Sequence, residues 1–220
     1  MVAVRGSATR EVPPEIARVS VEVSARDADR RATLARLADR VAAVRAELDS
    51  FAAAIERRET SNLSVWPETK GRVERVTAYH GSASTTVTVT DLTVLGDLML
   101  RLADLDHTSV SGPWWAVRPD SPVHRDVRRA AVEDAVQRAR EYAGAVGARL
   151  VRLLEISDLA LGAQPVAVRA LGFTGAGADS GPTFDLDPQV QTVQAEVAMR
   201  FTITEPVGIT GGDGRRDPVP

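Results

Sequence analysis

GPWWAVRPDSPVHRDVRRAAVEDA, residues 112–135, carries two adjacent tryptophans, a proline-containing turn and then an arginine-rich segment. The turn predicts a helix start, because Ser121 can cap free backbone amides and Pro122 has no amide proton to leave unbonded. Gly147 predicts where this helix ends. Alanines recur along the expected helix at every fourth position, and so small a face lets the helix lie close to its neighbour. They are Ala131, Ala135, Ala139 and Ala143.

The tryptophan pair belongs to a strand that we expect over residues 107–118. Successive side chains of a strand point to opposite faces, so the two indoles lie on opposite sides of a sheet. We expect Trp114 in the helix-covered core, because its companions on that face, such as Val110, are apolar. Trp115 then lies on the open face or at an edge. Two interpretations of Trp115 stay open: an interface anchor, or an indole shielded by the loop over 162–187.

The segments before this stretch predict strands and one long helix. Strict alternation of apolar and polar residues over 17–25 predicts a half-buried strand, and residues 2–8 predict a shorter one. Asp27 or Asp29 caps the helix that follows. Its apolar residues recur at spacings of three and four, which favours a helix lying on a sheet over a coiled coil, because the run covers only about three heptads. They are Leu34, Leu37, Val41, Val44, Leu48 and Phe51.

The rest of the chain is mostly strand. Residues 61–68 and 75–90 predict two strands joined by a polar turn, and Asp91 caps a shorter helix after them. Strand patterns return over 149–161 and 192–203. The expected order is β-β-α-β-β-α-β-α-β-β-β, in which strands often follow one another directly. This order predicts an α+β fold of mostly antiparallel sheets with helices packed on one face, and a sheet face open to water or to another subunit.

The composition limits the classes of function. The chain contains no cysteine, which excludes disulfides and thiolate metal sites. Its net charge is −3, with acids interspersed among the arginines, and this balance argues against a nucleic acid or an anionic membrane as partner. No apolar run is long enough to cross a membrane, and the first residues lack the apolar segment of a signal peptide. We therefore expect no membrane insertion and a cytoplasmic protein.

No pattern typical of catalysis or of a cofactor site stands out. The three histidines, His80, His107 and His124, lack the spacing of metal ligands, and Asp104 and Asp106 beside His107 fit a polar turn better than a cation site. There is no Gly-x-Ser-x-Gly nucleophile motif, and the glycine-rich segments lack the lysine and the following helix of a phosphate-binding loop. We expect a protein that is not an enzyme and that uses neither a metal nor a cofactor.

Three segments together resemble a known family. They are SNLSVWPE over 61–68, AYHGSASTTVTVTDLTVLGDL over 78–98, and the stretch over 110–150 that contains the tryptophan pair and the alanine-rich helix. This combination resembles the SIMPL-domain family, which includes bacterial periplasmic immunogenic proteins and oxidative-stress-defence proteins. The resemblance covers roughly residues 2–204. No catalytic residues are established for the family, so none can be carried over.

The resemblance implies two small α+β lobes. Here we expect residues 1–26 with 108–204 as one lobe and 27–107 as the other, followed by a disordered tail over 205–220, which has too few apolar groups to order. The family includes members that assemble into large rings, so the resemblance also implies a homo-oligomer. We therefore expect a non-enzymatic interaction or self-assembling protein with a role in stress defence.

The alternative that the sequence leaves open is a small-ligand-binding protein. Its ligand would occupy the cleft between the two lobes. Tyr79, Trp115 and Arg118 are the side chains that we expect to line it. The same three residues are our candidates for contacts with a protein partner.

Overall fold

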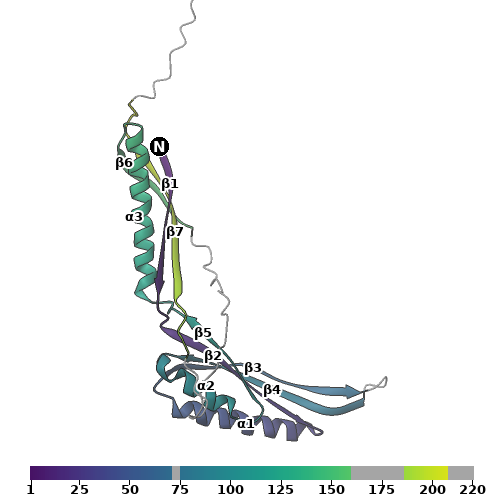
Figure 1. The fold of residues 1–220 in the computed structure, drawn as a ribbon. Coiled ribbons are helices and arrows are strands. Elements are labelled where there is room, and N and C mark those ends of the chain that lie inside the picture. The colour runs from purple at the N-terminus through teal and green to yellow at the C-terminus, as the bar shows by residue number, and fades with distance from the viewer. Residues whose placement is uncertain (71–74, 160–185, 208–220) are drawn as a thin grey trace, which may run out of the picture. The chain divides into compact units, whose positions relative to one another are not determined.

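The computed structural model describes residues 1–70, 75–159 and 186–207, which form two compact units (Figure 1). The described residues of unit 1 are 1–12, 119–159 and 192–207, and those of unit 2 are 13–70, 75–118 and 186–191. Both strands that we expected to join the first lobe, over 16–27 and 108–116, thus lie in unit 2. The expected loop up to residue 185 and the tail from residue 208 lie outside the described residues.

Unit 2 is a four-stranded antiparallel sheet with helices on one face, in the strand order β3-β4-β2-β5. The strands are β2 (Ile16–Asp27), β3 (Ile55–Lys70), β4 (Arg75–Val89) and β5 (Thr108–Ala116). The helices are α1 (Arg30–Ser50), the short 3₁₀ turn η1 (Leu92–Val94) and α2 (Leu95–Ala103). The expected α+β fold class is confirmed, because strands that follow one another in sequence pair antiparallel and the helices lie on the sheet.

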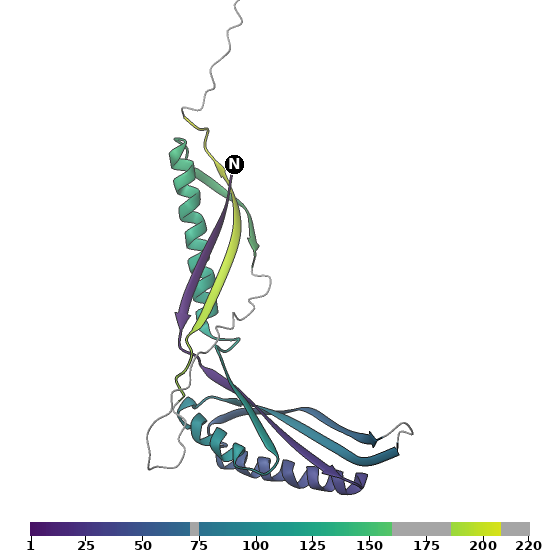
Figure 2. The same cartoon turned by 45° about the vertical axis from the view of Figure 1, so that its right-hand side comes forward.

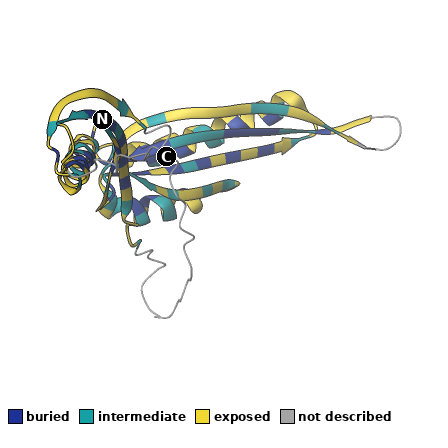
Figure 3. Cartoon of the chain, turned by 90° about the horizontal axis from the view of Figure 1, so that it is seen from above, coloured by how far each residue is buried: buried dark blue, intermediate teal, exposed yellow. Residues whose placement is uncertain are grey.

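The core of unit 2 follows the predicted strand alternation. Every second residue of β2, from Ala17 to Ala25, is buried under α1 and α2, and the residues between them face the other way. Figure 3 shows this alternation of buried and exposed residues along the long strands. The helices contribute Leu37, Leu48, Leu95, Leu98 and Leu102 to the same core. Each fully buried side chain of this kind stabilises the fold by roughly 1.5–3 kcal/mol.

Helix α1 begins where the sequence predicts but turns a different residue inward. The Asp29 carboxylate caps it by accepting a hydrogen bond from the Ala32 amide at 2.9 Å. Leu34 is 43% exposed, while Thr33 is fully buried in its place. Here α1 lies close to Gly81 of β4, because a Cβ added to this glycine would lie only 3.3 Å from Thr33 Cγ2. The small threonine fits this close approach of helix and sheet, whereas a leucine would not.

Unit 1 is a three-stranded sheet with one long helix against it, in the strand order β1-β7-β6. The strands are β1 (Val2–Val12), β6 (Leu150–Asp158) and β7 (Gln191–Ile203), and the helix is α3 (Pro122–Ala145). Figure 2 shows β1 and β7 running in opposite directions along α3. Among the described residues two strands follow α3, whereas the expected order had three.

The start, the end and the inward face of α3 are as predicted. The Ser121 hydroxyl accepts a hydrogen bond from the Val123 amide, Pro122 opens the helix, and Gly147 follows it with a φ of +69°. All four alanines of the predicted stripe are buried. The stripe allows a close approach, because a Cβ on Gly6 of β1 would lie only 2.1 Å from the Ala131 carbonyl oxygen. Unit 1 is therefore built on a tight contact between β1 and α3.

Candidate functional site

Strand β6 is one edge of the unit 1 sheet, since among the described strands its neighbour in the order β1-β7-β6 is β7 alone. Large apolar side chains of this strand are exposed: Val151 by 64%, Leu153 by 43%, Leu154 by 44% and Ile156 by 53%. We call these residues the β6 edge. An edge strand offers unpaired backbone donors and acceptors, and natural proteins usually protect it with lysine, proline or a covering element. Strand β6 contains neither lysine nor proline, but it carries the charged Arg152, Glu155 and Asp158 and shifts register twice against β7. Within the part of the chain that the structure describes, its apolar side chains are nevertheless exposed.

The position of α3 explains why these side chains are exposed. The helix lies against β1, where Gly6 lets the two backbones meet, and it makes far fewer contacts with β6. Leu153 and Ile156 stand opposite Phe201 and Met199 of β7, whose side chains are buried on the α3 side of the sheet. Leu153 and Ile156 therefore point to the same side, but there the helix does not cover them. The apolar surface of the sheet extends beyond its helix.

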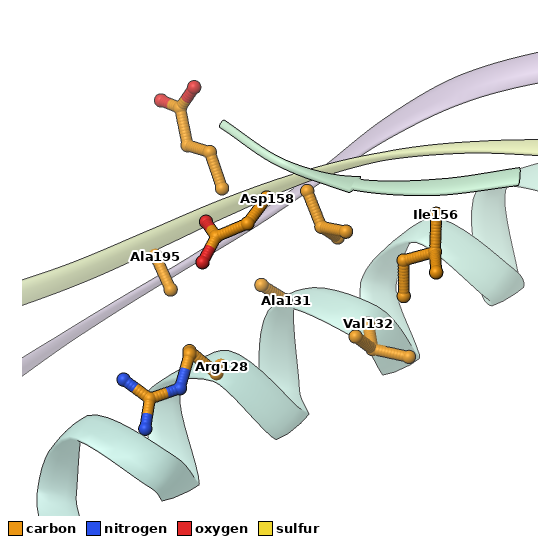
Figure 4. A pocket seen from close by; sticks show the side chains of 8 residues that line it. Arg128, Ala131, Val132, Ile156, Asp158 and Ala195 are labelled. Atoms are coloured by element: carbon orange, nitrogen blue, oxygen red, sulfur yellow. The ribbon is translucent and has the colours of Figure 1, made fainter. Parts of the chain in front are cut away.

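A hollow of about 140 Å³ opens between α3 and the end of β6 (Figure 4). Small side chains on both walls, Ala131 of α3 and Ala195 of β7, leave this space. Figure 4 shows Ile156 reaching toward Val132 of α3. Arg128, Asp158, Glu196 and Val197 complete the lining. The hollow continues the β6 edge and offers room for an apolar side chain of a partner.

Unit 2 exposes an aromatic and charged cluster on β3, β4 and β2. The Trp66 indole, which is 46% exposed, stacks on the His80 ring with centroids 5.8 Å apart and planes 13° from parallel. Glu68 Oε2 lies 2.8 Å from His80 Nε2 and accepts a hydrogen bond from Arg26 Nε at 2.8 Å. The hydrogen bonds from Arg26 and from His80 lower the pKa of the Glu68 carboxyl to about 2. The pKa of Arg26 is raised by its hydrogen bond to Glu68.

The expected placement of the tryptophan pair is wrong. Trp114 is 53% exposed, whereas Trp115 is half-buried and packs against the core of unit 2. The cause is a bulge in β5: Ser111 faces Ser20 and Trp114 faces Arg18, so two residues of β5 stand opposite one residue of β2. The extra residue reverses which face the following side chains occupy.

Gly112 makes the bulge possible. Its φ of +120° is one that other residues rarely adopt, and an added Cβ would lie 2.9 Å from the Arg18 carbonyl oxygen. A glycine-proline pair inside an otherwise regular strand pattern is a known signal for a bulge or an edge. The pair therefore signals an irregularity in the strand, but the face that each tryptophan occupies depends on where Gly112 meets β2.

The three residues expected to share a ligand site do not meet at one place. Tyr79 stands opposite Asp27 of β2, while Trp115 stands opposite Ala17. Ten residues of extended strand separate these two positions, which is about 33 Å. Arg118 lies near Trp115 in sequence and is engaged by Glu56, with its two terminal nitrogens 3.0 Å and 2.7 Å from the carboxylate oxygens. Tyr79 therefore cannot line a small-ligand site together with Trp115.

The three histidines lie in different local settings. His80 belongs to the cluster beside Trp66, His107 lies in the turn before β5 with a φ of +56°, and His124 lies in the first turn of α3. Within the described ranges, no group of three or more His, Asp or Glu side chains could hold a metal ion. None of the helices in those ranges is long and apolar enough to span a membrane.

Two exposed surfaces were not predicted from the sequence. The cluster of Trp66, Glu68 and His80 had a local signal, because Trp66 and Glu68 stand two residues apart in a predicted strand and so share a face. The β6 edge had a weaker signal: apolar residues follow one another there without the alternation of a half-buried strand. That pattern is typical of a strand buried on both faces, which β6 is not.

These features define a class of protein: an α+β chain of two units, each with an antiparallel sheet and helices against it, and with exposed polar and apolar surfaces on its strands. The chain belongs to the SIMPL family. The family model, described as "Protein of unknown function (DUF541)", matches residues 2–201. This match confirms the resemblance found in the sequence. No curated protein matches the chain.

Proposed function

We propose that this chain is a non-enzymatic protein that assembles with further copies of itself through the β6 edge. The single observation that carries the proposal is the exposure of Val151, Leu153, Leu154 and Ile156 on an edge strand. A strand from another copy can extend the sheet there, because backbone hydrogen bonds supply affinity and alternate side chains supply specificity. The hollow beside Ile156 gives one such side chain a place to insert.

The expected strength of this contact is moderate. Covering half-exposed Val, Leu and Ile side chains contributes roughly 1 kcal/mol each, and the four residues of the β6 edge together contribute a few kcal/mol. Backbone hydrogen bonds along the edge add to this, while association costs freedom of motion. Because these opposing contributions are of similar size, the assembly should depend on protein concentration.

The physiological role that we propose is defence against oxidative stress. This part rests on the family resemblance alone, since the family includes oxidative-stress-defence proteins. Cells that lack the protein should lose viability in peroxide, and the wild-type gene should restore it. A variant with a disrupted β6 edge should fail to restore it if assembly is required for the role.

Light scattering on the purified full chain tests the assembly. Wild-type protein should show a mass well above 23.5 kDa at tens of micromolar, and the mass should fall on dilution. The double variant V151K/L154K places cations on the edge and should be monomeric. Tyr142→Lys, at a 63% exposed residue of α3, is the matched control and should assemble like the wild type. A monomeric wild type, or assembly that survives V151K/L154K, would contradict the proposal.

A further inference from the structure

The face of the unit 2 sheet that points away from α1 and α2 is rich in hydroxyl groups. Strand register places Ser64, Ser82 and Ser24 side by side in one row across β3, β4 and β2. Three further rows of the sheet also carry hydroxyl side chains. One row holds Ser84 and Ser109, the next holds Thr86, Ser20 and Ser111, and the last holds Thr88. We call this surface the hydroxyl face. Ser82 and Thr88 are buried beneath their longer neighbours on this face, whereas the other hydroxyl residues are half-buried or exposed.

An exposed tryptophan stands at each end of the hydroxyl face. Trp66 lies in the row of His80 and Arg26, and Trp114 lies in the row of Arg18. The two indoles are 46% and 53% exposed. Arg18 and Arg26 are eight residues apart in β2, so the two rows are about 26 Å apart along the strand. The face is thus an extended surface with an aromatic ring at each end.

The charges of the hydroxyl face balance. The face carries three arginines and three glutamates, and the glutamates lie in other rows than the arginines: Arg18, Arg26 and Arg57, and Glu22, Glu59 and Glu68. Several of these groups pair within the face: Arg26 bonds to Glu68 at 2.8 Å and Arg57 lies 3.5 Å from Glu59. A surface with no net charge does not attract the phosphates of nucleic acid or of anionic lipid. Serine is also depleted in the core of protein–protein interfaces, which argues against a protein partner.

We propose that the hydroxyl face binds a neutral carbohydrate chain. The apolar face of a sugar ring can cover an indole, which offers a large rigid surface at low cost in conformational entropy. The hydroxyl groups of the sugar can exchange hydrogen bonds with serine and threonine and with carboxylates whose positions are already fixed. Glu22 Oε1, for example, accepts a hydrogen bond from Ser82 at 2.6 Å. An extended polymer is needed to reach both tryptophans. The surface lies in unit 2 and does not involve the β6 edge of unit 1.

Native gel electrophoresis of the full chain in gels that contain hydroxyethyl cellulose, galactomannan or dextran tests this proposal. At least one of these neutral polymers should retard the wild-type protein. Trp66→Ala and Trp114→Ala should each weaken binding by about tenfold, equivalent to 1.4 kcal/mol, because each removes one stacking surface. Tyr142→Ala removes an exposed aromatic ring from unit 1 and should leave retardation unchanged.

A folding control and two charged polymers complete this test. Circular dichroism should show wild-type folding for both tryptophan variants, since each indole is largely outside the core. The proposal is overturned if none of the three neutral polymers retards the wild type, or if the variant W66A/W114A binds as well as the wild type. It is also overturned if heparin or single-stranded DNA causes retardation and the neutral polymers do not.

Discussion

Gly6 is the residue on which the packing of unit 1 most depends. An added Cβ would lie 2.1 Å from the Ala131 carbonyl oxygen and 2.5 Å from the Ala135 nitrogen, and both atoms belong to the backbone of α3. A helix backbone cannot move aside as the end of a long side chain can. Overpacking usually costs 1–3 kcal/mol, and here we expect Gly6→Ala to cost about 3 kcal/mol or more. Urea denaturation measures this change.

Gly144→Ala is the matched control for this substitution. No atom outside its own helix lies within 4 Å of the Cβ that alanine would add in α3, so nothing obstructs it. Alanine also favours the helix over glycine, and we expect a gain of about 0.5 kcal/mol. If Gly6→Ala proves as harmless as Gly144→Ala, then β1 and α3 do not approach each other as closely as described.

The tryptophan pair gives a second prediction at the scale of residues. Trp115 packs against the core of unit 2, so Trp115→Ala should lower the free energy of unfolding by roughly 2–3 kcal/mol, less than for a fully buried aromatic residue. Trp114 is mostly in solvent, so Trp114→Ala should change the free energy of unfolding by no more than about 0.5 kcal/mol. Chemical denaturation of both variants measures these changes and shows which of the two tryptophans faces the core. The reverse order of effects would support the strand parity read from the sequence and would rule out the bulge.

At the scale of elements, local patterns predicted most of the fold. The alternation in β2, the Asp29 cap of α1, and the Ser121 and Pro122 start of α3 depend only on neighbouring residues, and all are as predicted. The face assignment in β5 was wrong because its bulge depends on where Gly112 meets β2, which is a contact between distant segments. A single extra residue reverses a whole strand end, since side chains alternate with a period of two.

The end of the β3–β4 pair should respond to acid through Glu68. Its pKa is about 2 in the folded chain against an ordinary value of 4.5, so the unfolded chain binds this proton more readily. The stabilisation is therefore complete above pH 4.5 and is lost as the pH falls from there toward 2. Because the carboxyl is exposed, solvent screens the effect and keeps it small.

Glu68→Gln should isolate this contribution. The urea midpoint of the wild type should fall more than that of the variant between pH 5 and pH 3. This interval covers the upper part of the range, from pH 4.5 toward 2, over which the stabilisation by Glu68 is lost. Glu59→Gln, on the same strand, is the control, and its dependence on pH should match the wild type. Equal losses for Glu68→Gln and the wild type would show that Arg26 and His80 do not hold the carboxylate.

At the scale of the whole molecule, the candidate surfaces were hard to predict because they depend on what covers a strand. The apolar run of β6 indicated a buried strand, yet α3 lies against β1, and within the described residues β6 is an edge strand with exposed apolar side chains. The fold class and the family could be predicted from the sequence. The separation of Tyr79 from Trp115 could not, because it follows from the pairing of both with opposite ends of β2.

Hydrogen exchange at β6, measured as a function of protein concentration, tests self-assembly through this edge most directly. The β6 amides that do not bond to β7 have no strand partner among the described residues of a single copy, and they become hydrogen-bonded when another strand adds to the edge. Between low and tens-of-micromolar concentrations, exchange over residues 151–156 should slow markedly, while exchange in β5, an edge strand of the other sheet, should stay the same. Exchange in β6 that is fast and independent of concentration would contradict self-assembly through the β6 edge.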